Sequence, residues 1–151
     1  PSEAGLAIDC RTAYDWLIGH GVAPQRLIVV GESLGSGFAV KLAAEVPVAA
    51  VALESHYVSM SAIAKTRYWW LPVDLLIHNP IDAGAVIARY RGPLLMQHGD
   101  ADETIPISIG RELYSRANDP KDFVVIKGAG HFIYTPETFD RELDFFARYV
   151  Q

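Results

Sequence analysis

The pentapeptide GESLG, residues 31–35, places a serine between two glycines directly after the apolar run LIVV at 27–30. A stretch rich in small residues, typical of a helix, follows at 34–46. The pattern G-x-S-x-G alone is weak evidence, because ordinary glycine and serine usage produces it in roughly one chain of this length in twenty. Between a strand and a helix, however, it predicts a sharp turn that lifts the Ser33 hydroxyl above the sheet, beside the positive end of a helix dipole. Ser33 is therefore a candidate nucleophile.

A serine hydroxyl becomes a good nucleophile only when a base removes its proton, and a carboxylate should orient that base. Asp102, in HGDADETIP, follows the apolar segment 93–99, and His131, in GAGH, follows the apolar segment 123–128. The chain order serine, aspartate, histidine is one of the three known orders for such a triad. These residues predict acyl-transfer chemistry.

Strand and helix patterns alternate along the chain and supply the scaffold for these side chains. Short apolar runs predict strands at 27–30, 48–54, 93–99 and 123–128, and periodic or capped segments predict helices at 3–20, 34–46, 108–118 and 136–150. The alternation indicates an α/β fold with a mainly parallel sheet of about four strands flanked by helices. Ligands of such sheets bind beyond the carboxyl ends of the strands, where the three candidate residues fall.

Taken together, the motifs GESLGSG, HGDADETIP and GAGH resemble the serine-hydrolase branch of the α/β-hydrolases, and the resemblance covers almost the whole chain. It implies that Ser33 is the nucleophile, Asp102 the orienting acid and His131 the general base. It also implies that the backbone N–H of Leu34 is one oxyanion donor. The family pattern favours Asp102 over Asp100, which we expect to be a turn residue, with the reversed assignment as the alternative.

Two features depart from the family pattern. Relatives usually carry further strands before the nucleophile, and a loop there supplies a second oxyanion N–H, for which residues 1–28 offer no counterpart. We therefore expect a single domain over 1–151 with a partial α/β-hydrolase fold that lacks the N-terminal strands. Loss of one oxyanion donor costs about 3–4 kcal/mol of transition-state stabilisation. The first strand would then be an exposed edge, which favours a homo-oligomer.

The second departure from the family pattern is His56 in LESHYVS, which stands at a position that is often proline in relatives and which we expect near the substrate pocket. The segment 59–90 is aromatic and interrupted by prolines, so it is a possible lid or substrate wall, with ordinary packing onto the sheet as the alternative. We expect substrate contacts from five residues: Glu32, His56, Tyr57, Trp69 and Trp70.

Composition limits the classes of function. The chain has 151 residues and a net charge of -5, which fits one globular domain and argues against nucleic acid as a partner. It contains no stretch of 18 apolar residues, so we expect no transmembrane segment. Cys10 is the only cysteine, which favours a reducing, cytoplasmic location. Histidine and carboxylates occur together in HGDAD without a second ligand pair, so we expect no metal site.

The predicted function is hydrolysis of a carboxylic ester, a thioester or a related acyl bond in a small-molecule or acyl substrate, through an acyl-enzyme and without a cofactor. A peptidase of the same fold is an alternative, since ester and amide cleavage use the same triad. The second alternative is a catalytically inactive fragment or a binding module that keeps the fold.

Overall fold

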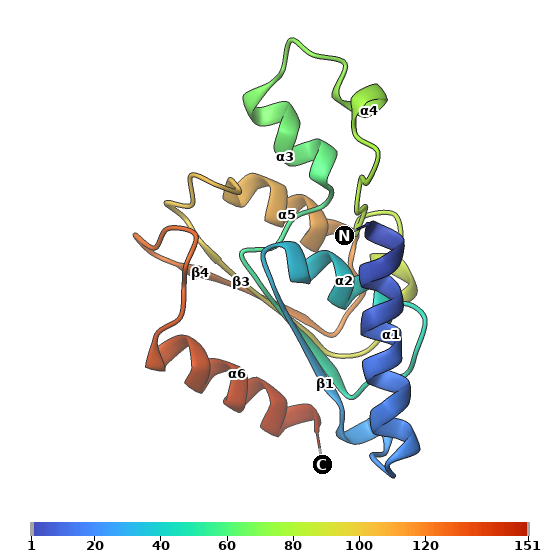
Figure 1. The fold of residues 1–151 in the computed structure, drawn as a ribbon. Coiled ribbons are helices and arrows are strands. Elements are labelled where there is room, and N and C mark those ends of the chain that lie inside the picture. Colours follow the sequence, from blue (N-terminus) through green and yellow to red (C-terminus); the bar gives the residue numbers. More distant parts are fainter. Residues whose placement is uncertain (1, 151) are drawn as a thin grey trace.

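A computed structural model describes residues 2–150 of the chain. Its sheet contains four parallel strands in sequential order, namely β1 (Ile28–Glu32), β2 (Ala50–Glu54), β3 (Leu94–Gly99) and β4 (Lys121–Ile126) (Figure 1). The strand ends are level, because Glu32 pairs with Glu54 and Glu54 with Gln97. The sequence-based prediction of a parallel, four-stranded α/β sheet is confirmed.

Helices cover both faces of the sheet unequally. They are α1 (Glu3–Gly19), α2 (Leu34–Ala43), α3 (Met60–Arg67), α4 (Val73–Leu76), α5 (Ile107–Arg116) and α6 (Pro136–Tyr149), with short 3₁₀ turns at Pro24–Arg26 and Ile87–Arg89. Residues of α1, α2, α3 and α5 join the larger hydrophobic cluster on one face, whereas α6 alone packs on the other (Figure 1). Parallel strands in sequential order place their crossover helices on one face when every crossover is right-handed.

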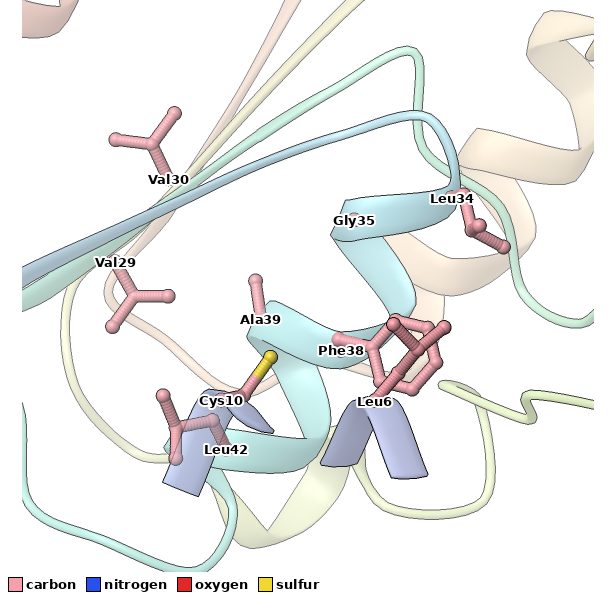
Figure 2. Close-up of a pocket in the computed structure, with 9 residues that line it drawn as sticks. All are labelled: Leu6, Cys10, Val29, Val30, Leu34, Gly35, Phe38, Ala39 and Leu42. Carbon is pink, nitrogen blue, oxygen red and sulfur yellow. The ribbon is translucent and has the colours of Figure 1, made fainter. Parts of the chain in front are cut away.

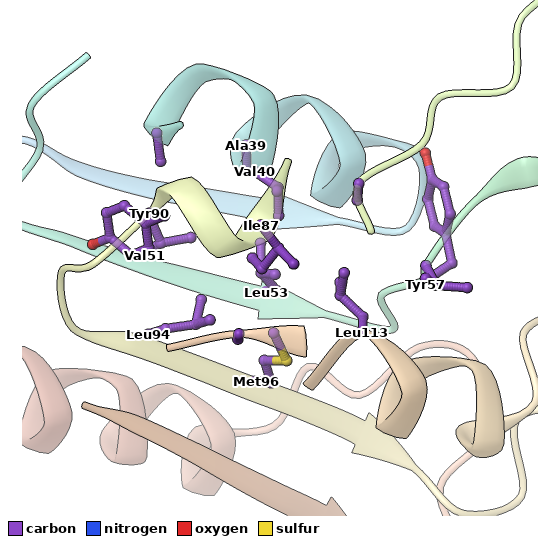
Figure 3. Close-up of a cluster of buried hydrophobic side chains, with 14 of the residues drawn as sticks. Ala39, Val40, Val51, Leu53, Tyr57, Ile87, Tyr90, Leu94, Met96 and Leu113 are labelled. Carbon is purple, nitrogen blue, oxygen red and sulfur yellow. The ribbon is translucent and has the colours of Figure 1, made fainter. Parts of the chain in front are cut away.

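The main core lies between the sheet and the crossover helices. Leu53 of β2 and Met96 of β3 point from the sheet toward α2 and α5, where Val40 and Leu113 are almost completely buried (Figure 3). On the opposite face Phe145 of α6 packs against small and medium apolar side chains of the strands, Ala50, Ala52 and Leu95. This two-sided burial holds the carboxyl ends of β2 and β3 in place.

Side chains directly before two of the helices cap them. Ser2 accepts a hydrogen bond from the N–H of Gly5 at the start of α1. Thr135 accepts one from the N–H of Thr138, whose side chain accepts one from the N–H of Thr135, with Pro136 at the first position of α6. The capping box fixes where α6 begins, five residues after His131.

The outer side of β1 is open. A groove of about 320 Å³ runs along β1 between α1 and α2, and Figure 2 shows the side chains that line it, among them Leu6, Cys10, Val29 and Phe38. On the α6 side of the sheet, Val30 is 52% exposed. Within residues 2–150 the run at 27–30 is therefore covered on one face, as expected for a strand at the edge of the sheet.

A polar layer replaces the apolar core at the carboxyl ends of the strands on the α6 face. Gln97 donates from Nε2 to Glu142 Oε1 (3.2 Å) and to the carbonyl of Thr138 (3.3 Å). Glu54 and Glu142 are both buried beside one another. Burial, reinforced by the nearby Glu54 carboxylate, raises the pKa of Glu142 to about 7.

Glu142→Gln should alter the pH dependence of stability. The folded-state pKa of Glu142 lies above its ordinary value of 4.5. The contribution of Glu142 to the free energy of unfolding is therefore complete below about pH 4.5 and is lost as pH rises through about 7. The free energy of unfolding of Glu142→Gln minus that of the wild type should therefore rise between pH 4.5 and 8, by up to about 3 kcal/mol. Urea denaturation at several pH values measures this difference. Asp144→Asn controls for the loss of one negative charge from α6, and a pH-independent difference for Glu142→Gln would contradict the assignment.

Candidate active site

Ser33 occupies a strained turn between β1 and α2. Its backbone has φ +47° and ψ −120°, a conformation that a residue with a side chain rarely adopts. The turn is held by the Ser33 N–H, which donates to the carbonyl of Glu54 (3.0 Å), and by Ser36 Oγ, which donates to the carbonyl of Ser33 (2.7 Å). A Cβ on Gly31 would lie 2.7 Å from the Ala39 Cβ, so the strand can pass α2 this closely only with glycine at that position.

A chain of hydrogen bonds joins the three predicted residues. His131 Nε2 lies 2.9 Å from Ser33 Oγ, and His131 Nδ1 lies 2.9 Å from Asp102 Oδ2. The second carboxylate oxygen of Asp102 accepts the N–H groups of Thr104 (2.8 Å) and Ile105 (2.9 Å). When Nδ1–H donates to the carboxylate, the lone pair of Nε2 faces the serine hydroxyl. In this tautomer the imidazole can accept the proton of that hydroxyl.

The competing carboxylate, Asp100, lies in a different environment. It is exposed, and its Oδ1 accepts the N–H of Gly128 (2.6 Å), which joins the loops that follow β3 and β4. Asp102, by contrast, is buried against His131 and His98. Of the two carboxylates, the structure brings Asp102 to the imidazole.

Ser55 holds the histidine loop, although no motif in the sequence singles it out. Its backbone is also strained, with φ +44°, and its side chain is completely buried. Ser55 Oγ donates to the backbone carbonyl of His131 over 2.5 Å, and its N–H donates to the carbonyl of Gln97 over 3.0 Å. The only signal in the sequence is its place directly after β2, one strand away from Ser33.

Two buried histidines lie behind the acid. His98 Nε2 donates to the carbonyl of Ile105 (2.9 Å) and lies 3.4 Å from Asp102 Oδ2. His56 packs edge-on against His98 and Phe123. Burial, and next the neighbouring His98, lowers the pKa of His56 to about 3. His56 was expected to contact substrate, but it is completely buried against His98 and Phe123 and does not line the cavity described next.

An apolar cavity of about 150 Å³ lies beside the nucleophile, and its walls are Ser33, Leu34, Tyr57, Met60, Ile63, Thr104 and Ile105. Tyr57 is the expected substrate contact that lines it, and its hydroxyl donates to the carbonyl of Leu34 (3.2 Å). The volume equals about five water molecules at roughly 30 Å³ each, which is enough for a short acyl group. Leu34 begins α2, where backbone N–H groups have no partner within the helix.

The other expected substrate contacts lie outside this cavity. Glu32 accepts a hydrogen bond from the Tyr134 hydroxyl (3.2 Å). Trp69 and Trp70, on the segment between α3 and α4, are 82% and 65% exposed and do not line the cavity. In the structure, therefore, α3 forms one wall of the cavity while the aromatic residues that follow it face outward.

Comparison with known proteins relates the chain to the α/β-hydrolases. No protein-family model matches the chain. An uncharacterised protein of Mycobacterium tuberculosis is 38% identical over 141 residues, which cover 93% of this chain and 50% of that protein. Human alpha/beta hydrolase domain-containing protein 17B is 33% identical over 138 residues, 87% of this chain and 44% of that protein. The chain thus spans about half the length of the curated relatives it matches.

Solved structures show the same fold. The esterase domain of a Rhodothermus marinus protein superposes with a TM-score of 0.73 and 26% identity over 95% of this chain and 68% of that one. An acetyl xylan esterase from Paenibacillus sp. R4 gives a TM-score of 0.79 at 19% identity over 95% of this chain and 52% of that one. The chain is therefore related to the α/β-hydrolase superfamily, which confirms the resemblance seen in the sequence.

His56 should remain neutral throughout the range in which histidines usually titrate. Because its folded-state pKa of about 3 lies below the ordinary 6.5, it contributes stability above about pH 6.5 that is lost as pH falls toward 3. The ring signals of His56 in NMR spectra, assigned with His56→Asn, should keep a constant shift between pH 4.5 and 8. Movement with a midpoint near pH 6.5 would show that the ring is not buried as described.

Proposed function

We propose that this chain carries the nucleophile, base and acid of a serine hydrolase that cleaves carboxylic esters, thioesters or related acyl bonds. The relationship to the α/β-hydrolase superfamily supports a hydrolase in general. The proposal of a serine hydrolase in particular rests on the hydrogen-bond chain from Ser33 through His131 to Asp102. Both hydrogen bonds of the imidazole ring in this chain are 2.9 Å long.

The proposed reaction begins when His131 Nε2 accepts the Ser33 proton while Ser33 Oγ attacks the carbonyl carbon of the substrate. Asp102 holds the imidazole in the required tautomer and stabilises the imidazolium that forms. The backbone N–H of Leu34, at the N-terminus of α2, donates to the developing oxyanion. Collapse of the tetrahedral intermediate expels the alcohol or thiol, which takes the proton from His131, and leaves an acyl group on Ser33.

Water then completes the cycle. His131 removes a proton from the attacking water, and a second tetrahedral intermediate releases the carboxylic acid and restores the Ser33 hydroxyl. The acyl group would occupy the apolar cavity formed by Leu34, Tyr57, Met60 and Ile63. An ester or thioester is favoured over an amide because the 26%-identical structural relative is an esterase domain.

A fluorophosphonate probe should label Ser33 and no other serine. Label should disappear in Ser33→Ala and fall at least about a hundredfold in rate in His131→Ala, because the hydroxyl then lacks its base. Ser61→Ala, on α3, is the matched control and should label like the wild type. Mass spectrometry of the adduct identifies the residue. An unlabelled wild-type chain that is folded by circular dichroism would support the inactive-module alternative.

Substitution of Ser55 should lower the rate through the position of His131. Ser55→Ala and Ser55→Gly both remove the hydroxyl that donates to the His131 carbonyl, but only glycine also relieves the strain at φ +44°. We expect each variant to lose kcat on p-nitrophenyl esters on the order of tenfold, with KM little changed. Ser55→Gly should nevertheless be more stable than Ser55→Ala, by about 1 kcal/mol. Recovery of wild-type kcat in Ser55→Gly would assign the effect to backbone strain and exclude the hydroxyl.

A further inference from the structure

The segment that joins α3 to α4 stands away from the sheet (Figure 1). Its apolar side chains are exposed to solvent. We call residues 68–77 the aromatic tip. Its large exposed side chains are Tyr68, Trp69, Trp70, Leu75 and Leu76, of which Trp69 is 82% and Leu75 84% exposed. Large apolar side chains that gather on an exposed segment mark a site of interaction with a partner.

The aromatic tip is held in shape by contacts at its base. Lys65 Nζ lies 2.7 Å from Asp74 Oδ2, which ties α3 to α4. Arg67 Nη2 donates to the carbonyl of Glu103 (3.2 Å), next to Asp102. Val73 is buried. The tryptophans are therefore exposed on a defined turn, and ordering this surface costs little additional entropy when a partner binds.

We propose that the aromatic tip inserts into the interfacial region of an anionic phospholipid bilayer. Tryptophan and tyrosine have an apolar ring with one polar group, which suits the depth at which headgroups meet acyl chains. Leucine side chains between them supply apolar surface that reaches further inward. The combination of aromatic rings and leucines on a projecting turn matches such an interface.

Charge favours the same partner. The aromatic tip itself contains one charged residue, Asp74, and Lys65 and Arg67 at its base bring the local balance to one surplus positive charge, whereas the whole chain carries a net charge of -5. An acidic protein approaches an anionic surface most favourably through such a segment. The neighbouring groove, lined by Ser59, Lys65, Asp74, Glu112 and Arg116 among others, is polar and offers no apolar slot for a peptide helix.

The contact would be peripheral. Among residues 2–150 no helix is both long and apolar enough to cross a bilayer. Met60 and Ile63, on the same helix that leads to the tip, line the cavity beside Ser33. A bilayer that binds the tip would therefore lie at the end of the helix that forms this wall. The proposal does not depend on hydrolysis, because binding involves neither Ser33 nor His131.

Co-sedimentation with unilamellar vesicles tests the proposal. The chain should bind vesicles of phosphatidylcholine with phosphatidylglycerol more strongly than vesicles of phosphatidylcholine alone, and tryptophan emission should shift to shorter wavelength. The double variant Trp69→Ser/Trp70→Ser should lower the partition coefficient about tenfold or more. Trp16→Ser is the matched control, because Trp16 is an exposed tryptophan on α1, and it should bind like the wild type.

Other results would overturn the proposal. Equal binding by the double variant and the wild type would assign vesicle binding to another surface, such as the open groove along β1. No binding to either vesicle would exclude a bilayer as the partner. Self-association that the double variant abolishes, and that vesicles do not compete with, would identify a second copy as the occupant. Ser33→Ala should bind vesicles like the wild type, which separates this proposal from the hydrolase proposal.

Discussion

The level register of the parallel hydrogen-bond ladder is the constraint on which the site depends. Glu32, Glu54 and Gln97 lie side by side, so the residues that follow them leave the sheet at the same height. The ladder continues one step further, because the Ser33 N–H donates to Glu54 and the Ser55 N–H donates to Gln97. Both serines adopt positive φ there, since each chain must turn away from its strand at once. A shift of one residue in any pairing would move the hydroxyl or the histidine loop out of contact.

Polar side chains are buried at the strand ends on both faces of the sheet, Glu54 and Gln97 toward α6 and His98 toward α5, and their burial costs free energy. Side chains at the strand ends must support loops whose backbone groups need partners, so histidine, glutamine and glutamate replace the aliphatic core there. His98 satisfies the carbonyl of Ile105, which in turn keeps the N–H of that residue directed at Asp102. Among the residues that the structure describes, Glu54 Oε2 and both ring nitrogens of His56 are buried without a hydrogen-bond partner. The site is thus stabilised as a network, while its individual members are destabilising when buried alone.

The sequence predicts the fold and much of the site because local signals agree with one another. The four apolar runs became strands, and Ser2, Thr135 and Pro136 start helices as their residue types require. The positions of Ser33, Asp102 and His131 follow from strand ends. Ser55 and the buried state of His56 could not be predicted, because both depend on side-chain directions at the end of β2 and on how closely α5 approaches. Gly110 allows that approach, since a Cβ there would lie 2.7 Å from His98 Nδ1.

The open side of β1 and the aromatic tip differ in physical character, although both expose apolar surface. Among the described residues no strand pairs with the outer side of β1, which accompanies a concave apolar groove, so a further polypeptide strand could pair with the backbone groups there. The tip is a projecting turn whose side chains, rather than its backbone, are exposed, so a fluid interface can receive it without matching its shape. The two surfaces therefore call for different kinds of partner, and neither has to be vacated for the other to be occupied.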